Sequence, residues 1–146
     1  MPPVFGDYLR LPKYGGIVQN RATSASLGSF DMAMPDEINA LILRLNQELD
    51  DVEQLLIEGL NLARTRIEQS PNNTILIQLF ATLNNYLLFV LTSTRRIEYA
   101  KSILSSDLVT LTQIQSAGED LGWLLGQIVE ARMVSKRIKE RLENWV

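Results

Sequence analysis

The chain has 146 residues, of which 46% are hydrophobic and 21% are charged, and its formal net charge is −3. This length and composition are those of one globular domain that buries a core. The absence of cysteine excludes disulfides and thiolate chemistry, and the absence of histidine removes the commonest general base and transition-metal ligand. The mildly acidic charge argues against nucleic acid as a partner. With no secretory signal at the N-terminus, we expect a cytoplasmic protein.

Residues 1–34 are predicted to form an extended or irregular N-terminal arm. Residues 1–33 hold three of the five prolines and four of the eight glycines, and no helical or strand period persists there. Apolar and aromatic residues such as Phe5, Tyr8 and Tyr14 indicate that the arm packs on a surface. That surface is either its own domain or a neighbouring subunit or partner, and the sequence leaves both open.

A helical domain is predicted over residues 35–146, and its first helix over about 36–69. Pro35 suits a first helical turn, and Asp36 and Glu37 favour the positive end of the helix dipole. The turn sequence at residues 70–73 predicts the end of the helix. Apolar residues between these ends recur in alternating steps of four and three, which defines a heptad seam. This seam comprises Ile38, Ile42, Leu45, Leu49, Val52, Leu56, Gly59 and Ala63.

Two further helices are predicted over about 74–104 and 107–145, and the capping sequence Ser105-Ser106-Asp107 should begin the second of them. A kink is the alternative at this point, because the sequence has no glycine stop here. Near-equal lengths and short connections favour an all-α fold, a long antiparallel three-helix bundle with up-down-up topology. The seam of the helix over 74–104 is Leu76, Phe80, Leu83, Leu87, Val90, Thr94, Ile97, Lys101 and Leu104. The seam of the helix over 107–145 is Ala117, Leu121, Leu124, Ile128, Ala131, Ser135, Ile138, Leu142 and Trp145.

A stretch without charge, from Gln69 to Thr94, indicates that the middle of the chain is surrounded by protein or by lipid. Its 26 residues are long enough to span a bilayer, for which about 20 apolar residues suffice. Against a span, Asn84 and Asn85 lie inside the stretch, where two carboxamides are costly in lipid. The helices on both sides also carry heptad seams that require a helical partner. The sequence therefore favours a soluble bundle without a membrane span.

The outer side of the second predicted helix is expected to form a subunit interface. Ile77, Leu88 and Phe89 lie off its seam, and in a lone bundle they would form an exposed apolar patch of the kind that monomers avoid. We therefore expect a homodimer or a higher homo-oligomer in which this helix, and the arm, contribute to the interface. Asn84 and Asn85 would pair with their mates across a two-fold axis and fix the register.

Three glycines are spaced four apart on the third predicted helix, at Gly118, Gly122 and Gly126. Each costs about 1 kcal/mol relative to alanine within a helix, so a ridge of three indicates close approach of another helix. That crossing would lie within the domain or within a dimer, and a hinge is the alternative. Trp123 lies off the seam, where it either anchors a partner contact or shields the glycine ridge.

Acidic residues cluster on the first predicted helix. Glu48 and Asp51 stand three apart, and Glu119 with Asp120 could supply a second pair, which is similar to the pattern of all-helical nucleotide pyrophosphohydrolases that bind magnesium. A solvated acidic face is the simpler interpretation, because residues 50–53 place their carboxylates on the polar side. The C-terminal helix is basic, which indicates either a solvated face or a patch for an acidic partner or nucleic acid. Its basic residues are Arg132, Lys136, Arg137, Lys139 and Arg141.

The sequence predicts a non-enzymatic assembly, adaptor or scaffold protein that acts through helix packing and arm docking on a protein partner. No catalytic residue, cofactor-binding residue or metal ligand is predicted, because no activated nucleophile and no phosphate loop is present. The alternatives are a small helical subunit of a nucleoprotein or defence complex, and a metal-dependent nucleotide hydrolase. The predicted interface residues are Ile77, Asn84, Asn85, Leu88, Phe89, Gly118, Gly122, Gly126 and Trp123.

Overall fold

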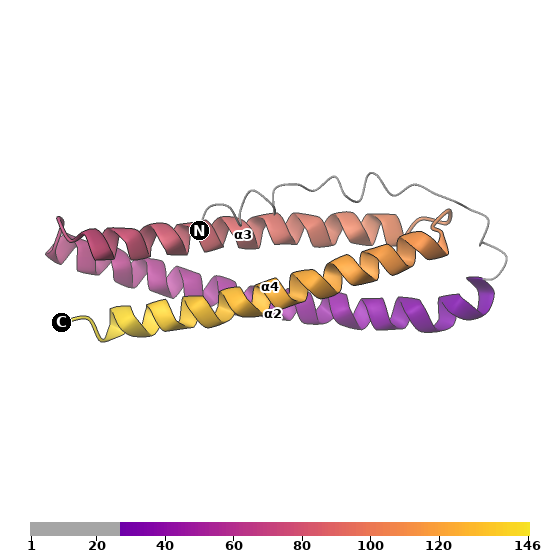
Figure 1. Cartoon of the computed structure of the whole chain (residues 1–146), viewed down its shortest axis with the longest axis horizontal. Coiled ribbons are helices and arrows are strands. Elements are labelled where there is room, and N and C mark those ends of the chain that lie inside the picture. The colour runs from indigo at the N-terminus through magenta and orange to yellow at the C-terminus, as the bar shows by residue number, and fades with distance from the viewer. Residues whose placement is uncertain (1–26) are drawn as a thin grey trace.

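The computed structural model describes the backbone of residues 27–146 and the side chains of residues 36–146. Over this range the chain forms three helices and no strand: α2 (Leu27–Gln69), α3 (Thr74–Leu104) and α4 (Leu111–Glu143). The helices lie side by side, with α2 and α4 pointing the same way and α3 running against them (Figure 1). The predicted all-α, up-down-up three-helix bundle is therefore confirmed.

The ends of α3 agree with the sequence prediction, whereas the start of α4 does not. Asn73 caps α3, because its side-chain oxygen accepts hydrogen bonds from the amides of Ile75 and Leu76 at 3.0 and 3.1 Å. The start of α4 predicted at residue 107 is wrong. The helix begins at Leu111, after Thr110, which forms a reciprocal capping box with Gln113. A Thr-x-x-Gln pair satisfies two orphan donors at once, so it is the stronger start signal.

The start of α2 also differs from the prediction. The helix begins at Leu27, nine residues before the predicted start, and Pro35 lies inside it. A proline inside a helix removes one backbone hydrogen bond, but it does not stop the helix when the flanking residues hold their helical conformation. Residues 27–34 of the predicted arm are thus helical. Residues 1–26 lie outside the described residues, so the docking of the arm remains a prediction.

The core follows the predicted seams of α2 and α4 along the whole bundle. All eight seam positions of α2 are buried, and those of α4 are buried except for Ile138 and Trp145, which are half-buried. Helices α2 and α3 approach closely at Gly59, because a Cβ atom at this position would lie 3.1 Å from Leu83 Cδ1. Leu83 itself is fully buried. The heptad pattern therefore identified the core-facing sides of both helices.

The predicted seam of α3 is buried at four of its nine positions, half-buried at Phe80, Leu87 and Leu104, and exposed at the other two. Thr94 and Lys101 are exposed, whereas Ser93 and Ala100, each one residue earlier, are buried. Because α2 and α4 cross one another beneath α3 (Figure 1), the side of α3 that faces the core changes along its length. The confirmed positions are Leu76, Leu83, Val90 and Ile97.

Candidate interaction surface

The outer side of α3 exposes large apolar residues. Ile77 and Leu88 are each 46% exposed, and Leu91 is 49% exposed. By length and composition α3 could cross a membrane, yet only 22% of its most apolar 18-residue window is buried inside the bundle. Within the described residues, the stretch without charge is thus only partly covered by the bundle.

These residues belong to a second heptad seam, which we call the outer seam. It comprises five exposed residues at alternating steps of four and three: Ile77, Ala81, Asn84, Leu88 and Leu91. The same steps lead on to Arg95 and Glu98, which are also exposed. Sequence reasoning identified Ile77, Asn84 and Leu88 but missed Ala81 and Leu91. The sequence contains the signal for both residues, because alternating steps of four and three from Ile77 lead to Ala81 and Leu91.

Two of the interface residues predicted on α3 do not lie on the outer seam. Phe89 is 2% exposed, so the expectation that it forms part of an exposed patch is wrong. Asn85 is half-buried, one residue from Asn84 and about 100° further around the helix. Phe89 is buried because the side of α3 that faces the core shifts along the helix. In the second half of α3 this buried side includes Phe89 and Ser93.

Among the described residues, the glycine ridge of α4 does not mediate a tight helix crossing. A Cβ atom at Gly118 would meet Ile38 at an ordinary 3.8 Å, and at Gly122 or Gly126 it would meet nothing within 4 Å. The part of the prediction that places the crossing inside the domain is therefore wrong for the described residues, and a crossing within a dimer stays a prediction. Trp123 is 56% exposed beside these glycines, so this part of α4 faces outward.

The carboxylates considered for magnesium do not gather at one place. Glu48 accepts a hydrogen bond from Arg132 Nε at 2.8 Å, in an ion pair that ties α2 to α4. Asp51 and Glu119 are exposed, and no group of three or more acidic residues suited to a metal occurs between residues 36 and 146. In this part of the chain, Glu48 thus serves a structural contact between helices.

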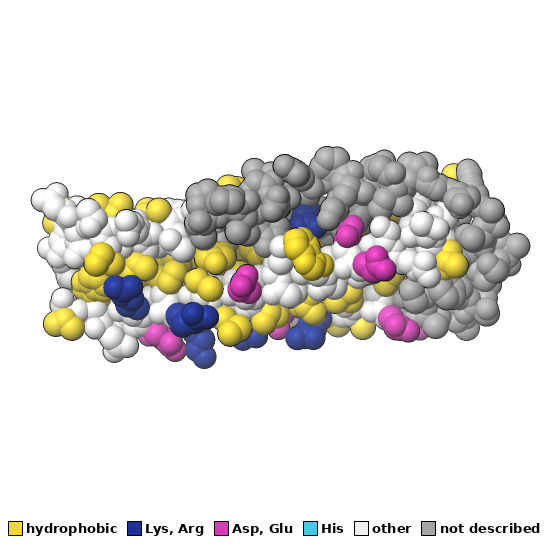
Figure 2. Space-filling view, viewed as in Figure 1, with side chains coloured by type: hydrophobic (Ala, Val, Ile, Leu, Met, Phe, Trp, Pro, Cys, Tyr) yellow, Lys and Arg dark blue, Asp and Glu magenta, His cyan; other side chains and the backbone are white. Residues whose placement is uncertain are grey.

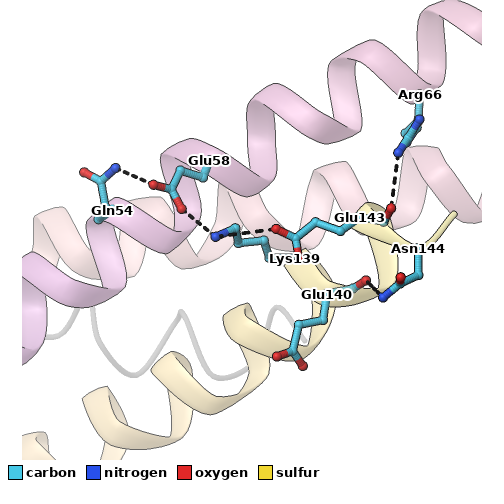
Figure 3. Close-up of polar contacts among 7 residues, drawn as sticks. All are labelled: Gln54, Glu58, Arg66, Lys139, Glu140, Glu143 and Asn144. Carbon is cyan, nitrogen blue, oxygen red and sulfur yellow. Dashed lines mark hydrogen bonds and ion pairs between the residues drawn. The ribbon is translucent and has the colours of Figure 1, made fainter.

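A second contact between helices involves the basic end of α4. Lys139 Nζ lies 2.6 Å from Glu58 Oε1, and Gln54 donates to the other carboxylate oxygen at 2.7 Å (Figure 3). The hydrogen bond from Lys139 lowers the pKa of Glu58, and the same bond raises the pKa of Lys139. Arg66 donates to the carbonyl oxygens of Leu142 and Glu143 at the C-terminus of α4, at 3.1 and 3.4 Å.

The basic residues of α4 are thus partly engaged by α2. Arg132 and Lys139, two of the five that make the helix basic, form ion pairs with carboxylates of α2. Figure 2 shows basic and acidic side chains interspersed along the lower edge of the face in view, with hydrophobic side chains in a band above them. These two residues therefore stabilise the packing of α4 on α2.

The described residues also line a small cavity where the α3–α4 connection meets α2. It has a volume of about 280 Å³, and Ile38, Ile42, Leu104 and Ile114 contribute apolar walls. Lys101 also lines it and is paired with Glu98 at 3.3 Å. None of the carboxylates considered above for magnesium lines this cavity.

Comparison with known proteins adds no relative. A scan against protein-family models, a search of curated proteins and a search of solved structures each found no match. The functional argument therefore rests on the surface of the bundle itself.

Proposed function

We propose that this chain is a non-enzymatic assembly protein, a scaffold or adaptor that associates with protein through the outer seam of α3. The observation that carries the proposal is the combination of exposure and missing charge. Ile77, Leu88 and Leu91 are about half exposed within a stretch of 26 residues that contains no Asp, Glu, Lys or Arg. Exposed apolar surface arranged in this way is typical of interaction sites.

A protein partner is a better match for this surface than lipid. Leu76, Leu83 and Ile97 of α3 are fully buried, so insertion of the helix into a bilayer would have to remove them from the core. Its C-terminal part also carries Arg95 and Glu98, and charged groups are costly in the hydrocarbon region. The heptad spacing of the outer seam is the pattern that a partner helix requires. The predicted contribution of the arm, of which residues 1–26 lie outside the described residues, is not needed for this proposal.

Light scattering on the full chain tests the proposal. We expect a mass of at least twice the 16.5 kDa of the chain at micromolar concentration. The double variant Leu88→Glu/Leu91→Glu should lower this mass to that of one chain while circular dichroism retains the helical signal. Leu43→Glu is the matched control, because Leu43 is 61% exposed on α2 and lies outside the outer seam. A wild-type protein that stays monomeric would overturn the proposal.

A further inference from the structure

The outer seam has a composition that limits what can cover it. Its five positions hold three large aliphatic residues, one alanine and one asparagine, and its charged continuation begins at Arg95. A complementary helix must therefore present an uncharged heptad seam of similar length. Helix α3 itself meets this requirement, because its charge-free part and its outer seam coincide.

We propose that the outer seam packs against the outer seam of a second copy of the chain, with the two α3 helices antiparallel and the two-fold axis between residues 82 and 83. This inference rests on the proposed function and adds the partner, the orientation and the register. Ile77 then packs beside Leu88 of the second copy, and Ala81 beside Asn84 of the second copy.

The charges near the C-terminal end of α3 decide the orientation. In a parallel pair, Arg95 would face Arg95 of the second copy and Glu98 would face Glu98, and like charges across an interface are unfavourable. In the antiparallel pair these residues separate to opposite ends. Arg95 then lies opposite residue 70 of the second copy, in the turn that follows the exposed carboxylate of Glu68. The antiparallel pair therefore avoids both contacts between like charges.

The register follows from the same residues. Moving the axis toward the C-terminus by half a heptad would place Arg95 beside Ile77 of the second copy, so the guanidinium would lose water without a partner. Moving the axis by half a heptad toward the N-terminus would place Leu88 opposite residue 70 of the second copy. Residue 70 lies before the start of α3 at Thr74, so Leu88 would lose its apolar contact. The proposed axis is also within one residue of the middle of the charge-free stretch.

Asn84 has a defined role in this register. It packs beside Ala81 of the second copy, and the small alanine side chain leaves room for a carboxamide. The two Asn84 residues approach each other across the axis, where each amide can donate to the other's carbonyl oxygen. A single polar residue in an apolar seam fixes register and partner number at a cost in stability.

Single cysteines test the orientation against a clean background, because the chain contains no cysteine. Disulfide formation requires Cα atoms within about 7 Å. A mixture of Ile77→Cys chains and Leu88→Cys chains, oxidised with copper phenanthroline, should give a cross-linked dimer. Ile77→Cys chains alone should not cross-link, because 11 residues separate positions 77 and 88, and this offset corresponds to about 16 Å along the helix. Cross-linking of Ile77→Cys with itself would overturn the antiparallel arrangement.

The remaining outcomes separate this inference from the proposed function. A dimeric wild-type mass without the mixed cross-link would refute the outer seam as the contact between copies but leave self-association intact. A monomeric wild-type mass would refute both proposals. Co-sedimentation of that monomer with vesicles of phosphatidylcholine and phosphatidylglycerol would assign the apolar face to lipid instead.

A charge placed at the two-fold axis gives an independent test without cysteine. Ala81→Glu sets two carboxylates beside the axis and should raise the dimer dissociation constant by on the order of 100-fold. Gln78→Glu is the matched control, since Gln78 is exposed on the same helix but lies outside the outer seam. Equal dissociation constants for the two variants would overturn the proposed register. Circular dichroism on each variant checks that the bundle remains folded.

Discussion

Replacing Gly59, Gly122 and Gly126 by alanine, one at a time, should stabilise the protein at the two α4 positions but not at Gly59. In a helix interior, alanine is more favourable than glycine by about 1 kcal/mol. At Gly122 and Gly126 the added methyl group meets nothing within 4 Å, so each variant should gain roughly this full amount. At Gly59 the methyl group would lie 3.1 Å from Leu83 Cδ1, and it must displace a side chain that is fully buried.

The cost of that displacement sets the expected result at Gly59. Overpacking a core costs about 1–3 kcal/mol, which offsets the gain in helix propensity. Gly59→Ala should therefore be less stable than Gly122→Ala by about 1–3 kcal/mol. The gain in helix propensity is the same in both variants, so the difference reports only the cost of overpacking. Urea unfolding followed by circular dichroism, at one protein concentration for all variants, measures the difference.

Two results would refute this reasoning. Equal stabilisation of all three variants would mean that α2 and α3 are not in close contact at Gly59. Destabilisation by Gly122→Ala or Gly126→Ala would mean that another helix covers the ridge, as the sequence pattern had suggested. Because neither glycine belongs to the outer seam, the comparison does not depend on the proposed dimer.

Two further sets of variants test polar contacts of the bundle. Ser135→Ala should raise the free energy of unfolding by about 1 kcal/mol, because the buried Ser135 hydroxyl has no hydrogen-bond partner among the described residues. Thr110→Ala should lower it by about 0.5–2 kcal/mol through loss of the cap of α4. Urea midpoints that shift in the same direction for both variants would contradict this pair of predictions. Glu58→Gln should be less stable than wild type at neutral pH, and the difference should shrink as pH falls. The pKa of Glu58 is lowered in the folded protein, so its contribution is present above its ordinary value of 4.5 and is lost as pH falls through the lowered pKa. A difference that is unchanged between neutral pH and about pH 3 would contradict the role of its hydrogen bond with Lys139.

The candidate surface could be predicted in part. The exposure of Ile77 and Leu88 follows from their positions away from the core seam. Helices α2 and α4 both pack on one side of α3, and residues on the opposite side cannot contact them. Phe89 could not be placed in this way. The burial of Phe89 depends on which side of α3 faces the core at that position, and the side that faces the core changes along the helix.

The sequence by itself determined the number of helices, their order and the buried sides of α2 and α4. These features depend on local periodicity: a residue every 3.6 positions returns to the same side of a helix, and Asn73 and the 70–73 turn end one helix and start the next. Only the tertiary structure decided that Ser93 and Ala100 face inward in place of Thr94 and Lys101, and that the glycine ridge of α4 lies open. Both depend on the angle at which the helices cross, because that angle sets which neighbour lies over each residue, and no local pattern in the chain encodes it.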